Sequence, residues 1–374
     1  MSFIKDSIIV LLGAGCSKQA GIPVSADMII DIENAIRGVD IDGEEARAWK
    51  AFQPLYYCIK SLILYGQGIG GKFGNGVNFN IETLVNTLSE LEKKEEHTIY
   101  PFIGNWNIKL MEVAGRSFGN VTGLREKIIS RLKAWVTIED YSKASYYSKI
   151  YEFQKSLNFG LRVFTLNYDL CMEKHRSHSM LERGFDENSR QWEWRRFEDN
   201  ENSPVDIFLY KMHGSIDWKR GANGVLTFSD EVSRVPLADL IFGTNYKFQY
   251  IDPYLFFAYE FRRYTLEAQL ILTIGYGFGD EHINGMIGQA LRSDPDRRIL
   301  CVLITETGKE EEKKAEIAES LQVSNPGQIV ICNKPAKEFM EEDLDIAKLK
   351  AVLPAEESVL EFSEENALEL VKET

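Results

Sequence analysis

The stretch SIIVLLGAGCSKQAGIP, Ser7–Pro23, decides the fold class. It opens with a β-branched and leucine run, Ile8–Leu12, which predicts a buried strand. The run leads directly into a glycine turn, and Ser17 then stands where a side chain can cap a helix that begins near Lys18. A strand, a glycine turn and a helix in this order are typical of the unit that opens a doubly wound α/β sheet.

The glycine turn of this stretch is suited to an anionic ligand. Gly13 and Gly15 would let the backbone approach a diphosphate, and a helix after Ser17 would present N–H groups and a positive dipole end. The spacing differs from the common G-x-G-x-x-G, because the next glycine, Gly21, comes six residues after Gly15. Taken alone, the turn is as compatible with a structural role as with nucleotide binding.

Five later apolar runs predict further strands. They are Leu161–Leu166, Ile207–Met212, Gln269–Ile274, Arg298–Ile304 and Gln328–Cys332, and the helical patterns between the later ones are Tyr254–Glu267, Asp280–Leu291 and Glu310–Leu321. Strands that alternate with helices predict an α/β fold with a doubly wound, Rossmann-like parallel sheet. We expect this domain to comprise residues 1–30 and 159–335.

Residues 31–158 have helical apolar spacing and predict a mostly helical insertion. Its helices are expected at Ala51–Tyr65, Ile81–Leu91, Leu124–Val136 and Tyr146–Leu157. Within it, GQGIGGKFGNG, Gly66–Gly76, lacks periodicity and is interpreted as a mobile loop, either a connector or a lid. Residues 336–374 are strongly acidic with scattered leucines, which predicts a helical tail at the surface or at a subunit contact.

The composition limits the class of protein. The chain has 374 residues, 44% of them hydrophobic and 27% charged, and its apolar runs are too short to cross a membrane. The net charge of −14 disfavours general nucleic-acid binding, which depends on Lys and Arg. Five scattered cysteines without a C-x-x-C pair disfavour disulfides and a zinc ribbon, so we expect a cytoplasmic protein with no secretory signal and no metal.

Two later segments place polar side chains after predicted strands, where open α/β sheets bind ligands. In TLNYD, Thr165–Asp169, Asn167 is suited to a ribose hydroxyl or a water molecule, whereas Asp169 either contacts the ligand or caps the next helix. In KMHGSIDW, Lys211–Trp218, His213 follows a strand and can exchange a proton near neutral pH.

A fourth segment, LTIGYGFGDEHIN, Leu272–Asn284, is another strand that runs into glycines and then a helix. Gly275 and Gly277 would bring a second backbone loop to the nucleotide. Asp280 and His282 fall in the first helical turn, where acidic and polar residues favour the helix start, so we interpret them as structural.

In order and spacing, the four segments resemble the sirtuin family, whose members combine GAGxSxxxGIP, T-x-N-x-D, a histidine followed by glycine, and a late glycine turn. The resemblance covers Ser7–Pro23 and Gly160–Ile304 and implies a sirtuin-type NAD-binding domain. The residues that it implies for NAD⁺ binding are Gly13, Ala14, Gly15, Cys16, Ser17, Ile22, Pro23, Thr165, Gly275, Tyr276, Gly277 and Phe278.

The chain departs from the protein deacetylases of that family. Their GIP is followed by Asp-Phe-Arg, but Val24, Ser25 and Ala26 follow Pro23 here, and Leu166 stands where they have glutamine. The cysteine positions cannot build their four-cysteine zinc ribbon. These departures disfavour acyl-lysine chemistry.

The string GYGFGDEHIN resembles sirtuin-like domains of bacterial antiphage systems, several of which degrade NAD⁺. That resemblance implies an NAD⁺-depleting effector that forms a homo-oligomer and acts with a HerA-type ATPase or another infection sensor. The predicted activity is hydrolysis of the nicotinamide–ribose bond, in which the cationic leaving group departs without a proton donor. We assign Asn167 to orient water and ribose, His213 to contact a ribose hydroxyl or take the water's proton, and Asp169 to support the pocket electrostatically.

Two other functions remain compatible with these residues. A module that binds NAD or ADP-ribose as a signal would use the same turns without releasing nicotinamide. A transferase would pass ADP-ribose or an acyl group to a protein instead of to water.

Cys16, beside the first turn, is either a small structural residue or a nucleophile with a lowered thiol pKa.

Overall fold

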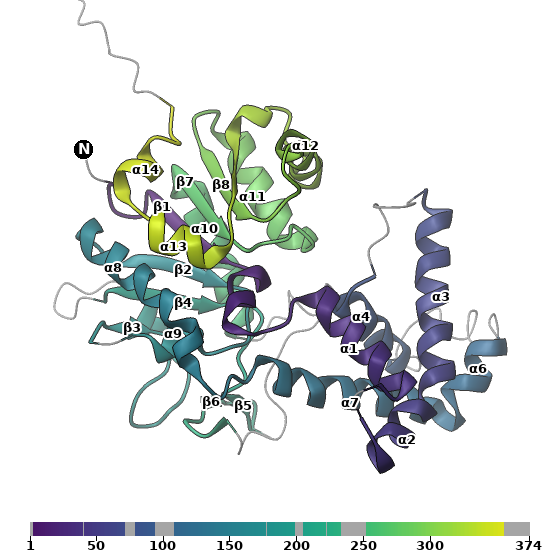
Figure 1. Ribbon diagram of the computed structural model, residues 1–374. Helices are drawn as coiled ribbons and strands as arrows, with labels where there is room; N and C mark the ends of the chain where they lie inside the picture. The colour runs from purple at the N-terminus through teal and green to yellow at the C-terminus, as the bar shows by residue number, and fades with distance from the viewer. Residues whose placement is uncertain are drawn as a thin grey trace, which may run out of the picture.

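A seven-stranded parallel sheet forms the centre of the computed structural model, which describes residues 3–39, 41–71, 79–93, 108–176, 178–198, 205–221, 223–232 and 252–354. The strand order is β3-β4-β2-β1-β7-β8-β9, and every neighbouring pair is parallel (Figure 1). The strands are β1 (Ile8–Leu12), β2 (Leu161–Thr165), β3 (Leu181–Glu182), β4 (Ile207–Lys211), β7 (Leu270–Ile274), β8 (Arg298–Leu303) and β9 (Ile329–Asn333). The predicted doubly wound α/β fold is confirmed.

The central strand β1 is buried on both faces, which explains its unbroken apolar run. Ile8, Val10 and Leu12 belong to one core cluster, and Ile9 and Leu11 belong to the other. The first cluster includes residues of α8 (Ser148–Leu157), α13 (Ala336–Glu342) and α14 (Ile346–Lys350). The second includes residues of α10 (Tyr254–Glu267), α11 (Glu281–Ser293) and α12 (Glu310–Leu321).

The strand order reverses at β1. From β1 the sheet extends through β2 to β4 on one side, and the chain then returns to β7 on the other side of β1 and continues to β9. Open α/β sheets bind ligands beyond the carboxyl ends of the strands at such a reversal. The turns after Leu12 and Ile274 both lie there, because these two residues pair in the β1–β7 ladder.

The helical block projects to one side of the sheet (Figure 1). Its helices are α1 (Ser25–Arg37), α2 (Gly43–Ala51), α3 (Gln53–Ile69), α4 (Ile81–Glu92), α6 (Ile108–Ala114) and α7 (Gly119–Val136). A 3-10 segment, Tyr141–Tyr147, leads back to α8, which packs against the sheet. The helical character expected for this block is confirmed, while its boundaries at 31 and 158 stay a prediction.

Two local predictions are wrong. No regular helix starts at Lys18: the chain forms two 3-10 turns, Ala14–Cys16 and Lys18–Ala20, because Gly21 adopts a left-handed φ of 96° and ends the second. The first α-helix starts only at Ser25. The predicted loop Gly66–Gly76 is also partly helical, since α3 continues to Ile69 through Gly66 and Gly68, and a glycine costs a helix only about 1 kcal/mol. Residues 72–76 of that loop lie outside the described residues.

Several short elements carry no clear sequence signal. They are β3, the antiparallel pair β5 (Trp218–Arg220) and β6 (Leu226–Phe228), the helix α9 (Cys171–Lys174) and the 3-10 turn Trp194–Phe197. Of the predicted tail, α13 and α14 are helical, and residues 355–374 lie outside the described residues. No helix in the described part of the chain is both long and apolar enough to cross a membrane.

Candidate functional site

The glycine turns after β1 and β7 pack backbone against backbone. Gly13 N donates to Ile274 O and Gly15 N donates to Gly275 O, each at 2.9 Å. A Cβ on Gly13 would lie 2.6 Å from Gly275 O, and a Cβ on Gly275 would overlap the Cys16 amide. Gly275 also has a left-handed φ of 67°. These glycines are therefore required for the two turns to meet, whatever else they bind.

The second turn has two further glycines with a different environment. The Cβ positions of Gly277 and Gly279 have no atom within 4 Å, and both residues line a cavity of about 620 Å³. At these two positions a ligand, rather than the protein, has room to approach the backbone.

The cavity lies at the sheet's reversal point, between the turns, the end of β2 and the helical block, which contributes residues 79–82, Leu132 and Val136. The predicted site residues in its lining are Gly13, Ala14, Gly15, Ser17, Ile22, Pro23, Asn167, Asp169, Gly275, Tyr276 and Gly277. The predicted residues outside its lining are Cys16, Thr165, His213 and Phe278. The structure therefore gathers most of the predicted residues around one space.

Asn167 connects the end of β2 to the first turn. Its Nδ2 donates to Gly13 O at 3.0 Å and to Ser17 Oγ at 3.1 Å, and its backbone N donates to Thr165 Oγ1 at 3.1 Å. The side chain is 9% exposed. These three contacts fix the carboxamide against the glycine turn at the cavity wall.

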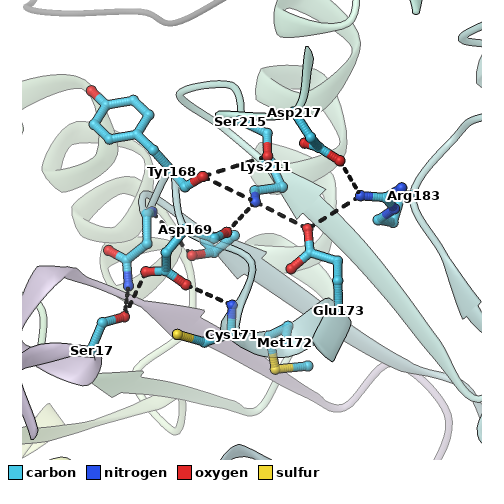
Figure 2. Close-up of polar contacts among 12 residues, drawn as sticks. Ser17, Tyr168, Asp169, Cys171, Met172, Glu173, Arg183, Lys211, Ser215 and Asp217 are labelled. Atoms are coloured by element: carbon cyan, nitrogen blue, oxygen red, sulfur yellow. Dashed lines mark hydrogen bonds and ion pairs between the residues drawn. The ribbon is translucent and has the colours of Figure 1, made fainter. Parts of the chain in front are cut away.

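Asp169 forms an Asx-type turn before α9 and contacts the first glycine turn. Its Oδ1 accepts from Cys171 N at 2.9 Å, which opens α9, and its Oδ2 accepts from Ser17 Oγ at 2.7 Å (Figure 2). Ser17 Oγ also lies 2.7 Å from the Tyr147 hydroxyl. The helix-cap alternative for Asp169 is not met, since the N-cap of α9 is Leu170 and no side chain caps it, whereas Asp169 does line the cavity.

Four charged side chains form a connected set of contacts that ends at the backbone of Asp169 (Figure 2). Lys211 Nζ donates to Asp169 O and lies 3.0 Å from Glu173 Oε1, and Arg183 bridges Glu173 and Asp217 at 3.5 and 2.9 Å. Burial acts to raise the pKa of Asp217, but the charges of Arg183 and Lys211 outweigh it and keep that pKa below its ordinary value. The sequence did not predict that these charged residues support the site.

The signal that could have revealed these contacts is a charged residue in a buried strand. Lys211 ends the otherwise apolar strand IFLYK and is 1% exposed. A lysine is almost never fully buried without a partner, so its position predicts nearby carboxylates. The sequence cannot say which carboxylate pairs with it, because Glu173 lies on another segment.

His213 is not among the residues that line the cavity. It is 3% exposed, and its Nε2 is 3.3 Å from Asp280 Oδ2. Asp280 itself lines the cavity, and its Oδ1 accepts from His282 N at 3.0 Å and Ile283 N at 3.3 Å. The interpretation of Asp280 as a helix start is confirmed, but this residue also contacts His213, which the sequence did not predict.

The loop between β7 and α11 is organised by Asn284. Its Oδ1 accepts from the Tyr276 hydroxyl at 2.7 Å, and its Nδ2 donates to Phe278 O at 2.8 Å. Phe278 has a left-handed φ of 57°, which this bond helps to stabilise. The Tyr276 and Phe278 rings therefore pack into the protein, and the loop presents backbone to the cavity.

Cys16 has the environment of a structural residue. Its side chain is buried, and its carbonyl accepts from the Tyr146 hydroxyl at 2.6 Å. Burial raises the pKa of the Cys16 thiol, which opposes the formation of a thiolate. The nucleophile alternative is therefore disfavoured.

In the described part of the chain, no group of three or more His, Cys, Asp or Glu side chains is arranged to hold a metal ion.

These features define an open α/β protein with a cavity at the reversal of its sheet. Residues 161–324 match a family model described as SIR2-like domain. The chain thus contains a SIR2-like domain, and the sirtuin-like resemblance is confirmed for this part. The match encloses Asn167, His213 and Asp280 and starts after the first glycine turn.

Comparison with curated proteins gives no match. Among solved structures, the chain is similar to a Sir2 homologue in complex with NAD, with 13% identity and a TM-score of 0.43 over 92% of this chain and 90% of that chain. It is also similar to a mutant Sir2 homologue in complex with 2′-O-acetyl-ADP-ribose, with 13% identity and a TM-score of 0.40 over 92% of each chain.

Proposed function

We propose that this protein is an NAD⁺ hydrolase that cleaves the nicotinamide–ribose bond and releases nicotinamide and ADP-ribose. The observation that carries the proposal is the position of Asn167, which is fixed to the first glycine turn at the wall of a cavity at the sheet's reversal point. A dinucleotide bound at such a reversal has its diphosphate beside the turns, and its nicotinamide ribose would then lie within reach of Asn167. The SIR2-like domain supports the same substrate class.

The chemistry needs few protein groups. The bond between ribose C1′ and the nicotinamide nitrogen breaks with its electron pair going to the ring, which neutralises the ring's positive charge. The positive charge moves to C1′ and the ring oxygen of the ribose, and a water molecule adds to C1′. Asn167 would orient the ribose and the water, while the Asp169 carboxylate in the cavity wall would favour the cationic transition state.

The diphosphate would find few free amides in the first turn. The N–H groups of Gly15, Cys16 and Ser17 already donate to backbone carbonyls. Lys18 stands beside them in the lining, and its 3.6 Å contact with Asp27 is solvent-exposed and therefore weak. We infer that the diphosphate binds through Lys18 and the open backbone of Gly277 and Gly279.

The test is product analysis with purified full-length protein and NAD⁺. We expect equimolar nicotinamide and ADP-ribose from the wild type, and a fall in kcat of about 10²-fold or more for Asn167→Ala. Asn188→Ala, at an exposed position in another loop, serves as the matched control with unchanged activity. Transfer to a protein in place of free ADP-ribose would indicate a transferase, and binding without nicotinamide release, with or without a partner, would indicate a sensing module.

We further propose that the protein acts in the cytoplasm as a homo-oligomeric effector that depletes NAD⁺ during phage infection, together with a HerA-type ATPase or another infection sensor. Support comes from the resemblance of GYGFGDEHIN to such effectors. Cells that produce the wild type should lose NAD⁺ after infection and yield fewer phage, whereas Asn167→Ala cells should do neither. Equal phage yields from both strains would contradict this role, and light scattering of the purified protein tests the oligomer.

A further inference from the structure

A second cavity, of about 430 Å³, lies at the amino ends of the central strands. It is lined by residues before β1 and at the start of β2, by the 3-10 turn Trp194–Phe197 and by one side of α10. The first cavity lies beyond the carboxyl ends of the same strands, and no described residue belongs to both linings. The proposed NAD⁺ hydrolysis therefore makes no use of this second cavity.

Arg162 supplies a buried hydrogen-bond donor to the second cavity. It is 3% exposed, and its Nε and Nη1 donate to Asp6 Oδ1 at 3.0 Å and to the Tyr210 hydroxyl at 2.8 Å. The ring centroids of Phe208 and Tyr264 lie 4.3 and 4.0 Å from its Cζ. In the described part of the chain, no group accepts a hydrogen bond from Nη2. This nitrogen is therefore the part of the guanidinium that remains for a ligand.

Glu260 supplies a carboxylate close to this donor. It is 5% exposed, and its Oε2 lies 3.5 Å from the Tyr210 hydroxyl, which Arg162 also contacts. Its Oε1 lies 3.9 Å from Arg263 Nη1. Both contacts are long, and burial raises the pKa of the Glu260 carboxyl. An N–H group of a ligand would stabilise the charged form of this carboxylate.

The rest of the lining indicates which class of ligand fits. Its charges balance, so a ligand with a large net charge of either sign is disfavoured. The uncharged lining residues are all aromatic, and two of them, Trp194 and Tyr259, are 43% and 60% exposed. Aromatic side chains stack on planar rings. The charged lining residues are Lys5, Asp6, Arg162, Glu198, Glu260 and Arg263.

We propose that the second cavity binds a purine nucleoside whose base has a carbonyl beside a ring N–H, as guanine does. The carbonyl accepts from Arg162 Nη2, the N–H donates to the Glu260 carboxylate, and the base stacks on the aromatic side chains. Because the Tyr210 hydroxyl contacts both side chains, the donor and the acceptor lie close together, as the adjacent groups of such a base require. The volume is in the usual range for a small-molecule site and has room for a two-ring base.

Calorimetry with the full-length protein and guanosine tests this site. Excess ADP-ribose in each titration keeps the first cavity occupied, so that a nucleoside bound there is not counted. We expect guanosine to bind at least about tenfold more tightly than adenosine, since adenine presents an NH₂ group to the arginine and a bare ring nitrogen to the carboxylate. Equal binding of the two nucleosides, or no guanosine binding up to about 1 mM, would overturn the proposal.

Two variants locate the bound nucleoside. Glu260→Gln replaces a carboxylate oxygen with an NH₂ group of similar size, and Trp194→Ala removes an exposed stacking ring. Each should weaken guanosine binding at least about tenfold, with a melting temperature close to that of the wild type. Glu316→Gln and Tyr65→Ala are the matched controls, because both residues are exposed and lie outside both linings. Wild-type affinity for guanosine in either second-cavity variant would overturn the proposal.

Discussion

The glycine turns after β1 and β7 look alike in the sequence, but their glycines serve different purposes. Gly13, Gly15 and Gly275 have no room for a side chain, because the two turns lie against each other. Gly277 and Gly279 have open space at the same kind of position and border the cavity. A glycine-rich motif at a nucleotide site thus combines residues that build the site with residues that leave room for the ligand.

The largest effect is expected at the contact between the turns. Gly275→Ala would place a methyl group on the Cys16 amide and force alanine into a left-handed φ of 67°, so we expect a loss of about 3 kcal/mol or more in the free energy of unfolding. Chemical denaturation measures this free energy of unfolding. Gly21→Ala is the control, because Gly21 is also left-handed but has no atom within 4 Å of its Cβ position. Equal losses for the two variants would show that backbone strain, not the contact between turns, makes Gly275 necessary.

A smaller effect, on binding alone, is expected on the open side of the second turn. Gly277→Ala has space for its methyl group, and we expect the free energy of unfolding to stay within about 0.5 kcal/mol of the wild type. The methyl group would stand where the ligand approaches the backbone, so Kd for NAD⁺ should rise about tenfold, a loss of about 1.4 kcal/mol. Calorimetry with NAD⁺ or ADP-ribose measures it, and an unchanged Kd would remove this turn from the binding site.

The regular elements of the fold could be predicted from the sequence. The limits of α10 and α12 coincide with their apolar patterns, and β1 and β7 agree with theirs to within a residue. These segments bury long, periodic apolar surfaces, and such periodicity depends only on the local sequence. In contrast, β3 and the β5–β6 pair are short and depend on the strands they pair with, so a local pattern gives them no signal.

The candidate site was predictable as a set of residues but not as a set of contacts. Asn167 and Asp169 follow a strand that ends at the reversal point, and position alone brings them to the cavity. Gly13 and Gly275 lie far apart in the chain. Neither motif alone therefore shows that a Cβ at one position would clash with the backbone of the other turn. The same applies to His213, whose partner Asp280 satisfies every local requirement of a helix cap.

The smallest effect is expected from the charge beside the first turn. If the first turn contributes little backbone to the diphosphate, Lys18 should supply most of the attraction on that side. Lys18→Gln should raise Kd for NAD⁺ about threefold, in line with an exposed charge pair of less than about 1 kcal/mol, and should weaken the dependence of binding on salt.

Lys309→Gln is the matched control for Lys18→Gln, because Lys309 forms a similar exposed pair with Glu306 and lies outside the cavity lining. Kd for NAD⁺ is measured at two salt concentrations. Salt screens the attraction of a charge but not a packing contact, so the comparison separates the two effects of the substitution. If Lys18→Gln binds NAD⁺ as tightly as the control at both salt concentrations, Lys18 does not hold the diphosphate, and backbone amides alone would have to bind it, either those of Gly277 and Gly279 or those of the first turn after its present hydrogen bonds rearrange.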